Sequence, residues 1–247
     1  MKKVMSIVFA AVAGVALAEN STLESANTYA ALRVDSSAVE TIVCVPWLSA
    51  SASGDTAIKI TDVVRTAELN AGDKLYYYDR ESGKYNVWVL KSNKEWEAAT
   101  TVSDSSLFVT TSNEPSLTRG NAFILVRENP ADAFYLFGQV PSSASPVMTM
   151  IRSSSAPVLT LFAPPSTSDT TINSGTWSNV NDGDMLIVDG KAPYTYVSGT
   201  GWCHKKITEG KTGWEYQFND TTDTIPAGQG AWFRAAKADG GNATWSL

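Results

Sequence analysis

The stretch LNAGDKL, residues 69–75, decides the fold of this chain, because it recurs with the same order of features as VNDGDML, residues 180–186. A Gly-Asp pair between an apolar residue and an alternating run is typical of a tight turn that feeds a strand. Glycine supplies a positive φ there, and aspartate bonds its local backbone. Each turn is followed by Gly-Lys, a tyrosine and a tryptophan, at 83–84, Tyr85 and Trp96 and again at 190–191, Tyr194 and Trp202.

A second block repeats in the same order. LTRGNAF, residues 117–123, corresponds to IPAGQGA, residues 225–231. Each block is followed by an apolar strand that ends in Arg127 or Arg234. Two matched blocks in matched order indicate an internally duplicated unit of about a hundred residues, which is a usual domain size.

Strand and turn signals are short and closely spaced along the chain. The runs 74–79 with 85–90, and 185–188 with 194–197, flank turn residues as hairpin strands do. Further strands are expected at 41–47, 107–111, 122–127, 134–140, 158–163, 214–218, 230–235 and 244–247. A short helix is expected at 61–67, whereas the corresponding stretch 170–180 is expected to be loop. The pattern predicts an all-β fold of two tandem small β-sandwich or barrel-like modules related by internal duplication, with at most one short helix.

The first eighteen residues have the features of a secretory signal. Lys2 and Lys3 precede the uncharged apolar run 4–15, and Ala16-Leu17-Ala18 fits the small-x-small rule of signal peptidase. An apolar run of about a dozen residues is shorter than the roughly 20 that cross a bilayer as a helix. We therefore expect cleavage after Ala18, no membrane span, and a secreted or extracytoplasmic protein of the periplasm, outer surface or extracellular space.

The expected organisation has five parts. They are a signal peptide (1–18), an N-terminal arm or edge strand (19–34), a first β module (35–140), a linker or closing strand (141–155) and a second β module (156–247). Residues 147–151 are apolar enough to close the first module. Residues 29–34 are expected either to pair with 41–47 as an edge strand or to complete the sheet of a neighbouring chain.

The charge balance excludes some partners. Cleavage removes Lys2 and Lys3 and no acidic residue, so the net charge moves from −6 to about −8. Acidic charge repels phosphate backbones, and no Lys/Arg cluster is present, so nucleic acid and anionic lipid are disfavoured.

Candidates for catalysis are few. His204 is the only histidine, which excludes triads and multi-histidine metal sites. Cys203 and His204 could form a dyad only formally, because adjacent residues of a strand point to opposite faces. We expect no enzyme activity, no cofactor and no metal.

Acidic residues leave two alternatives open, a calcium site and a glycosidase carboxylate pair. Asp182 with Asp184, and Asp220 with Asp223, could hold calcium through oxygen ligands, but neither pair fits a calcium-loop template. Solvated turn acids are the favoured interpretation. A glycosidase carboxylate pair is not excluded by spacing, although nothing selects one.

Cys44 and Cys203 are the two cysteines. In an exported protein they could form one intramolecular disulfide, an intermolecular disulfide, or remain as two buried free thiols. Their positions are not equivalent in the two modules, because the residue after Trp96 is Glu97.

Aromatic residues give the one candidate binding surface. Sugar rings stack on exposed tryptophan and tyrosine, so an aromatic strand face could bind glycans. Core packing is the competing interpretation, because Tyr77 points away from the face shared by its neighbours. The candidate ligand-binding residues are Tyr76, Tyr78, Tyr85, Trp88 and Trp96.

The chain resembles uncharacterised exported β-rich proteins of Gram-negative bacteria. The resemblance rests on the Gly72-Asp73 turn, Tyr85, Gly120, the opening strand IVCVPW (42–47) and the later segment AGQGAWFR (227–234). The resemblance spans most of the mature chain. It implies export and β architecture, and no activity.

These features together predict a noncatalytic exported structural or cell-surface protein that self-assembles through strand addition, with itself or other surface proteins as partners. The alternative is a carbohydrate-binding module that uses the aromatic strand face.

Overall fold

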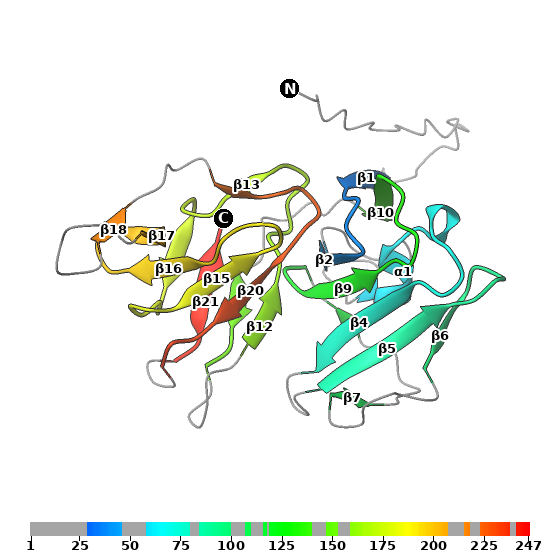
Figure 1. Cartoon of the computed structure of the whole chain (residues 1–247), viewed down its shortest axis with the longest axis horizontal. Coiled ribbons are helices and arrows are strands. Elements are labelled where there is room, and N and C mark those ends of the chain that lie inside the picture. The colour runs from blue at the N-terminus through cyan, green and yellow to red at the C-terminus, as the bar shows by residue number, and fades with distance from the viewer. Residues whose placement is uncertain are drawn as a thin grey trace, which may run out of the picture.

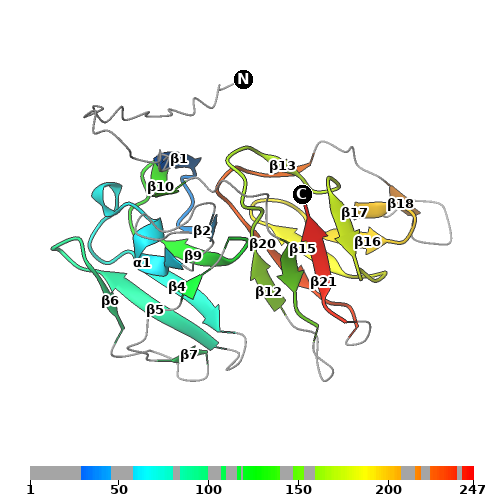
Figure 2. The same cartoon turned by 180° about the vertical axis from the view of Figure 1, so that it is seen from behind.

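The computed structural model describes residues 29–45, 58–79, 84–99, 107–109, 116–117, 119–139, 147–152, 159–206, 215–217, 223–237 and 241–247. The predicted signal peptide lies outside these ranges. The described residues form two groups of strands that lie side by side (Figures 1 and 2). We call them the N-terminal group (29–139) and the C-terminal group (147–247). Within these ranges, no helix is long and apolar enough to cross a membrane.

The N-terminal group has two β layers. Its larger sheet has the order β2-β9-β4-β5-β6, and β7 adds to β5 in parallel; β1-β10 and β3-β8 form the second layer. The elements are β1 (Tyr29–Asp35), β2 (Glu40–Cys44), β3 (Ile58–Lys59), α1 (Ile60–Val63), the 3₁₀ turn η1 (Thr66–Glu68), β4 (Lys74–Asp79), β5 (Lys84–Leu90), β6 (Trp96–Ala98), β7 (Phe108–Val109), β8 (Ser116–Leu117), β9 (Ala122–Val126) and β10 (Ala133–Gln139). Leu32 and Phe134 of the small layer share one buried core with Leu75 and Phe123 of the larger sheet, as in a sandwich.

The C-terminal group is also layered. Its larger sheet has the order β12-β20-β15-β16-β17-β18, and it is accompanied by a three-stranded sheet, β11-β21-β14, and the pair β13-β19. The strands are β11 (Met148–Met150), β12 (Leu159–Phe162), β13 (Thr170–Thr171), β14 (Thr176–Ser178), β15 (Met185–Val188), β16 (Tyr194–Val197), β17 (Gly201–Lys206), β18 (Glu215–Gln217), β19 (Thr224–Ile225), β20 (Ala231–Arg234) and β21 (Ala243–Ser246). The expected all-β class is confirmed.

The two larger sheets have the same order of pairing. β9 lies between β2 and β4, and β20 lies between β12 and β15. The register agrees as well, since Leu75 lies opposite Leu125 and Leu186 lies opposite Phe233, and all four are buried. The strand that follows each Gly-Asp turn therefore occupies the same place in its sheet.

The expected pairing of residues 29–34 with β2 is wrong. β1 pairs along its whole length with β10, from Tyr29 opposite Gln139 to Asp35 opposite Ala133. Its side chains alternate between buried and exposed, which suits a strand with one face on the core. β2 is buried continuously over 41–44, so it belongs to the larger sheet, which is covered on both faces there.

The expectation that residues 147–151 close the first module is also wrong. β11 pairs with β21, and Met148 and Met150 are buried in the C-terminal core. β11 therefore has the position in its group that β1 has in the other, because each pairs with the last strand of its group.

Two local expectations need correction. The helix expected over 61–67 divides into α1 and η1, because Val64 is extended and bridges Leu136 of β10. The stretch 170–180, expected to be loop, contains β13 and β14; β14 pairs with β21, which places Trp177 opposite Trp245.

Backbone bridges join the two groups reciprocally. Val43 of β2 bridges Gln229, and Phe162 of β12 bridges Asn121. The opening strand of each larger sheet thus contacts the turn that precedes β20 or β9 of the other sheet. We call this region the junction.

Gly228 lies in the junction and packs closely against β1. Its carbonyl accepts a hydrogen bond from the Cys44 N–H at 3.0 Å. A Cβ atom at Gly228 would lie 2.5 Å from Val34 Cγ2 and 3.1 Å from Leu32 Cδ2, so no side chain fits there without displacing β1.

We predict that Gly228→Ala destabilises the protein clearly more than Gly199→Ala. Both glycines have a left-handed φ, +77° and +76°, so each substitution brings about 1–2 kcal/mol of backbone strain. Gly199 has no neighbour within 4 Å of its would-be Cβ atom, whereas Gly228 meets β1. Denaturant unfolding of both variants measures the difference, and equal midpoints would show that the junction is not closely packed.

Candidate functional site

The aspartate of each Gly-Asp turn is buried and stabilises the turn through hydrogen bonds. In the N-terminal group this residue is Asp73. Asp73 is fully buried, and its Oδ2 accepts the Asn70 N–H at 2.8 Å. Its Oδ1 accepts the Glu128 N–H at 3.0 Å, just after β9. One side chain therefore fixes the turn and fastens it to the end of the neighbouring strand.

Asp184 makes the same two bonds in the C-terminal group. Its Oδ2 accepts the Asn181 N–H at 2.8 Å, and its Oδ1 accepts the Ala236 N–H at 2.8 Å after β20. Asp184 also forms a two-pronged ion pair with Arg152, whose Nη1 lies 3.0 Å from Oδ1 and whose Nη2 contacts Oδ2. Both side chains are almost completely buried, so this is a desolvated, paired charge.

The arginine near Asp73 is bound differently. Arg127 donates to the carbonyls of Ala131 (3.0 Å) and Ser36 (2.6 Å), and its guanidinium lies 5.0 Å from the Phe134 ring centre. Burial lowers the pKa of Arg127 from its usual value, and the charge of Asp73 partly offsets this effect.

The match of Arg127 with Arg234 that the sequence suggested does not hold in space. Arg127 follows β9 and is buried, whereas Arg234 lies within β20 and is exposed. The register places Arg234 opposite Met185, as Val126 lies opposite Lys74. The two arginines are therefore offset by one position.

The side chain of His204 contacts three neighbouring residues. Its Nε2 lies 3.4 Å from Asp223 Oδ2, its Nδ1 lies 3.3 Å from the Pro193 carbonyl, and its ring stacks on Tyr194 at 4.2 Å. Burial and the nearby Asp223 carboxylate raise the pKa of Tyr194. Both ring nitrogens of His204 thus face fixed oxygen atoms beside a stacked tyrosine.

The acidic pairs do not form a recognisable cation site in the described part of the chain. Asp184 is paired with Arg152, and exposed Asp182 accepts a hydrogen bond from a backbone N–H. Asp220 lies outside the described residues. No cluster of three or more His, Cys, Asp or Glu side chains occurs within the described ranges.

The cysteines are two buried free thiols in this structure. Cys44 belongs to the N-terminal core, whereas the Cys203 Sγ donates to the Thr195 carbonyl at 3.4 Å. The disulfide considered from the sequence is therefore not formed. Burial raises the pKa of both thiols.

Three of the five candidate aromatics come together on the outer face of the larger N-terminal sheet. The ring of Tyr85 lies 5.1 Å from Tyr78 and 6.3 Å from Tyr76. All three are partly exposed. Burial raises the pKa of Tyr76 and Tyr85, and the charge of Glu40 adds to this shift.

The other two candidates do not belong to this face. Trp88 is 3% exposed and lies opposite Leu75, so it faces the core. Trp96 lies opposite Leu90 and packs against the same core, with its indole nitrogen buried. Strand alternation separates these two side chains from the tyrosines.

Two aromatics that the sequence did not select complete the face. Phe108 of β7 lies 6.0 Å from Tyr85, and Trp232 of β20 lies 6.0 Å from Tyr78. Trp232 comes from the other group, so the surface crosses the junction. We call Tyr76, Tyr78, Tyr85, Phe108 and Trp232 the outer aromatic face. No local pattern could have found Phe108 or Trp232, because both arrive through long-range pairing.

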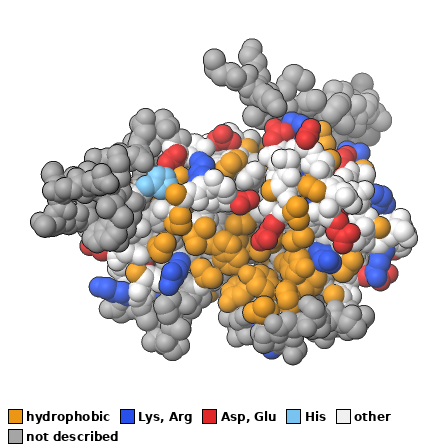
Figure 3. All heavy atoms as spheres, in the orientation of Figure 1, with side chains coloured by type: hydrophobic (Ala, Val, Ile, Leu, Met, Phe, Trp, Pro, Cys, Tyr) orange, Lys and Arg blue, Asp and Glu red, His pale blue; other side chains and the backbone are white. Residues whose placement is uncertain are grey.

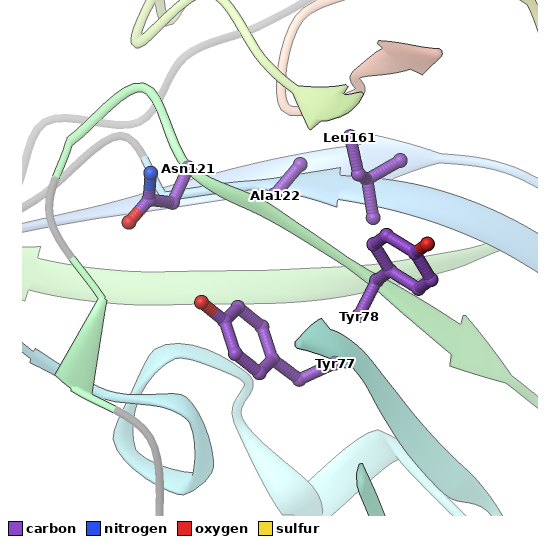
Figure 4. Close-up of a pocket in the computed structure, with 5 residues that line it drawn as sticks. All are labelled: Tyr77, Tyr78, Asn121, Ala122 and Leu161. Atoms are coloured by element: carbon purple, nitrogen blue, oxygen red, sulfur yellow. The ribbon is translucent and has the colours of Figure 1, made fainter. Parts of the chain in front are cut away.

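The recess next to this face is small. Figure 4 shows its lining side chains, which come from β4, β9, the turn before β9, and β12. They are Tyr77, Tyr78, Asn121, Ala122 and Leu161. The recess measures about 10 Å³, which is room for about one water molecule and not for a sugar ring. A ligand of this region would therefore bind to the surface.

Comparison of the chain with family models, curated proteins and solved structures finds no match. The chemistry of the described residues therefore carries the functional assignment.

We predict that Asp184→Asn lowers stability more than Asp73→Asn. Both variants lose one charged acceptor of a backbone hydrogen bond, about 1.5–3 kcal/mol. Asp184→Asn also leaves Arg152 as a buried, unpaired charge, so its total loss should reach about 3–5 kcal/mol. Denaturant unfolding measures both. Arg152→Met in the Asp184→Asn background should recover part of the loss, and an equal effect of the two single variants would contradict the prediction.

Neither thiol should react with a soluble disulfide reagent at pH 8 while the protein is folded. Burial and a raised pKa keep both as protonated thiols, whereas the thiolate is the reactive form. Denaturant should release two reactive thiols per chain. A single labelled thiol in the native protein, or a nonreducing mass about 2 Da lower, as a disulfide would give, would contradict this prediction.

Proposed function

We propose that this chain is a noncatalytic exported structural or cell-surface protein that assembles with itself or with other surface proteins. One observation carries the proposal: the buried charged side chains Asp73, Asp184 and Arg152 are engaged in holding turns and strand ends. Groups fixed in this way serve stability and are not available as an acid, base or nucleophile. Export is supported by the signal-like residues 1–18.

Strand addition is one route by which such a protein could assemble. β1 pairs with β10 over its seven residues, from Tyr29 to Asp35. If two chains exchanged this strand, each β1 would find the same partner positions on its neighbour. Exchange therefore keeps the contacts already present and adds a link between chains.

Glycan binding is the second candidate, and the outer aromatic face favours it. Tyr76, Tyr78 and Tyr85 are partly exposed on one face, and Trp232 extends it across the junction. Exposed tyrosine and tryptophan rings are the side chains on which sugar rings stack. Trp88 and Trp96 are no longer part of this proposal because they face the core.

We expect the purified mature chain, residues 19–247, to form species larger than a monomer by light scattering and to turn over no glycoside, ester or peptide substrate. Turnover that is abolished by a single carboxylate substitution would overturn the noncatalytic proposal. Retention of a monomeric protein in polysaccharide gels, lost in Tyr85→Ala at unchanged thermal midpoint, would instead select the glycan-binding candidate.

A further inference from the structure

The outer aromatic face is the centre of a larger apolar surface. Figure 3 shows hydrophobic side chains gathered in one patch in the middle of the molecule, where β4 and β5 lie next to β12 and β20 in Figure 1. On the C-terminal side, Ile187 lies opposite Trp232 and is partly exposed. Leu159 is 41% exposed and shares a strand face with Leu161, which lines the recess beside Tyr78.

This surface continues an interface that already exists within the chain. Leu161 and Ala163 of the C-terminal group belong to the N-terminal buried core, and Trp232 packs against that core. The outer faces of the two larger sheets thus pack on each other at the junction. The Tyr78–Trp232 ring contact stands at the border between the part that is covered and the part that is exposed.

Charges border the surface on both sides. On the C-terminal side, exposed Arg234 lies opposite Leu159. The residues that lie across the sheet from Tyr76 are Ile124 and Val87, and those across from Tyr78 include Tyr85, so these two rows carry no ionised side chain. In the neighbouring row Lys74 pairs with Glu128 at 3.9 Å. A chain with a formal net charge of −6 therefore presents uncharged central rows between flanking charges, with Arg234 on the row of Leu159.

The composition of this surface favours a protein partner over a sugar. Its rings contact each other edge to face or tilted, as Tyr76 and Tyr85 do at 86°, so part of each ring is already covered. Ile187 and Leu159 add aliphatic area, which buries well against protein but offers no hydrogen bonds to hydroxyl groups.

We propose that a second copy of this chain packs on the outer aromatic face together with Ile187 and Leu159. The proposal rests on the self-assembly proposed above and names its surface. A second copy is the occupant because the same two sheet faces already pack on each other inside one chain, and a copy brings both faces again. Association buries apolar area and leaves the Lys74–Glu128 pair at the rim, and Arg234 beside Leu159 can meet an acidic side chain of the second copy.

The test is sedimentation velocity of the mature chain from about 1 to 100 µM, with Leu159→Asp and Ile187→Asp as the interface variants. We expect a concentration-dependent dimer for the parent protein and at least a tenfold weaker dimer for each variant. Phe137→Asp is the matched control, because Phe137 is 42% exposed on β10 and lies outside this surface. The control should dimerise like the parent. Two variants are used so that a folding defect in one, seen by circular dichroism, leaves the other to decide.

A locked strand separates this proposal from strand exchange. Ala31 and Phe137 are register partners on β1 and β10, so Ala31→Cys with Phe137→Cys, oxidised in the monomer, fixes β1 to its own chain. Unchanged dimerisation of the locked protein supports the proposed face. If the locked protein no longer dimerises while the Leu159→Asp variant dimerises like the parent, the proposed face is wrong, and self-assembly occurs through strand exchange instead. A parent that stays monomeric at every concentration overturns both, and binding of that monomer to a polysaccharide gel would assign the face to glycans.

Discussion

The rest of the structure depends on a buried carboxylate that ties a turn to a strand end. Asp73 and Asp184 each accept one N–H from their own turn and one from just beyond the end of β9 or β20. A buried carboxylate without such donors would be strongly unfavourable, so turn and strand end are fixed together. The strand that follows each turn lies beside the strand whose end the carboxylate holds, β4 beside β9 and β15 beside β20. The remaining strands of each sheet add to this arrangement.

Local signals were enough to predict the hairpins and the all-β class. The Gly-Asp turns and alternating runs specify β4 with β5 and β15 with β16 through contacts near in sequence. Long-range pairing was not predictable in the same way. β1 and β11 have partners, β10 and β21, that are about a hundred residues away along the chain, and nothing local distinguishes them from other edges. Both were therefore assigned to the wrong neighbour.

The candidate site shows the same limit in its side chains. Strand alternation could already separate Tyr77 from Tyr76 and Tyr78, and the same rule applied to β5 would have placed Trp88 on the core side once its register with Leu75 was known. Phe108 and Trp232 could not be predicted from local sequence. Phe108 joins the face because β7 pairs in parallel with β5, and Trp232 joins it because the two groups meet at the junction. When a surface is formed by residues of both strand groups, the sequence of either group alone contains no pattern that predicts it.

The junction explains why an apolar outer face exists at all. In an isolated sandwich the outer side of a sheet faces water and carries polar residues, yet Ile42, Ile124 and Leu161 lie there and are buried. They are buried because the other group covers them. The tyrosines of β4 and β5 belong to the same face. Tyr76 and Tyr85 pack against the buried core, and they remain partly exposed, as does Tyr78. The exposed part of this face adjoins an interface that has already formed within the chain, which is the observation behind the proposed self-association.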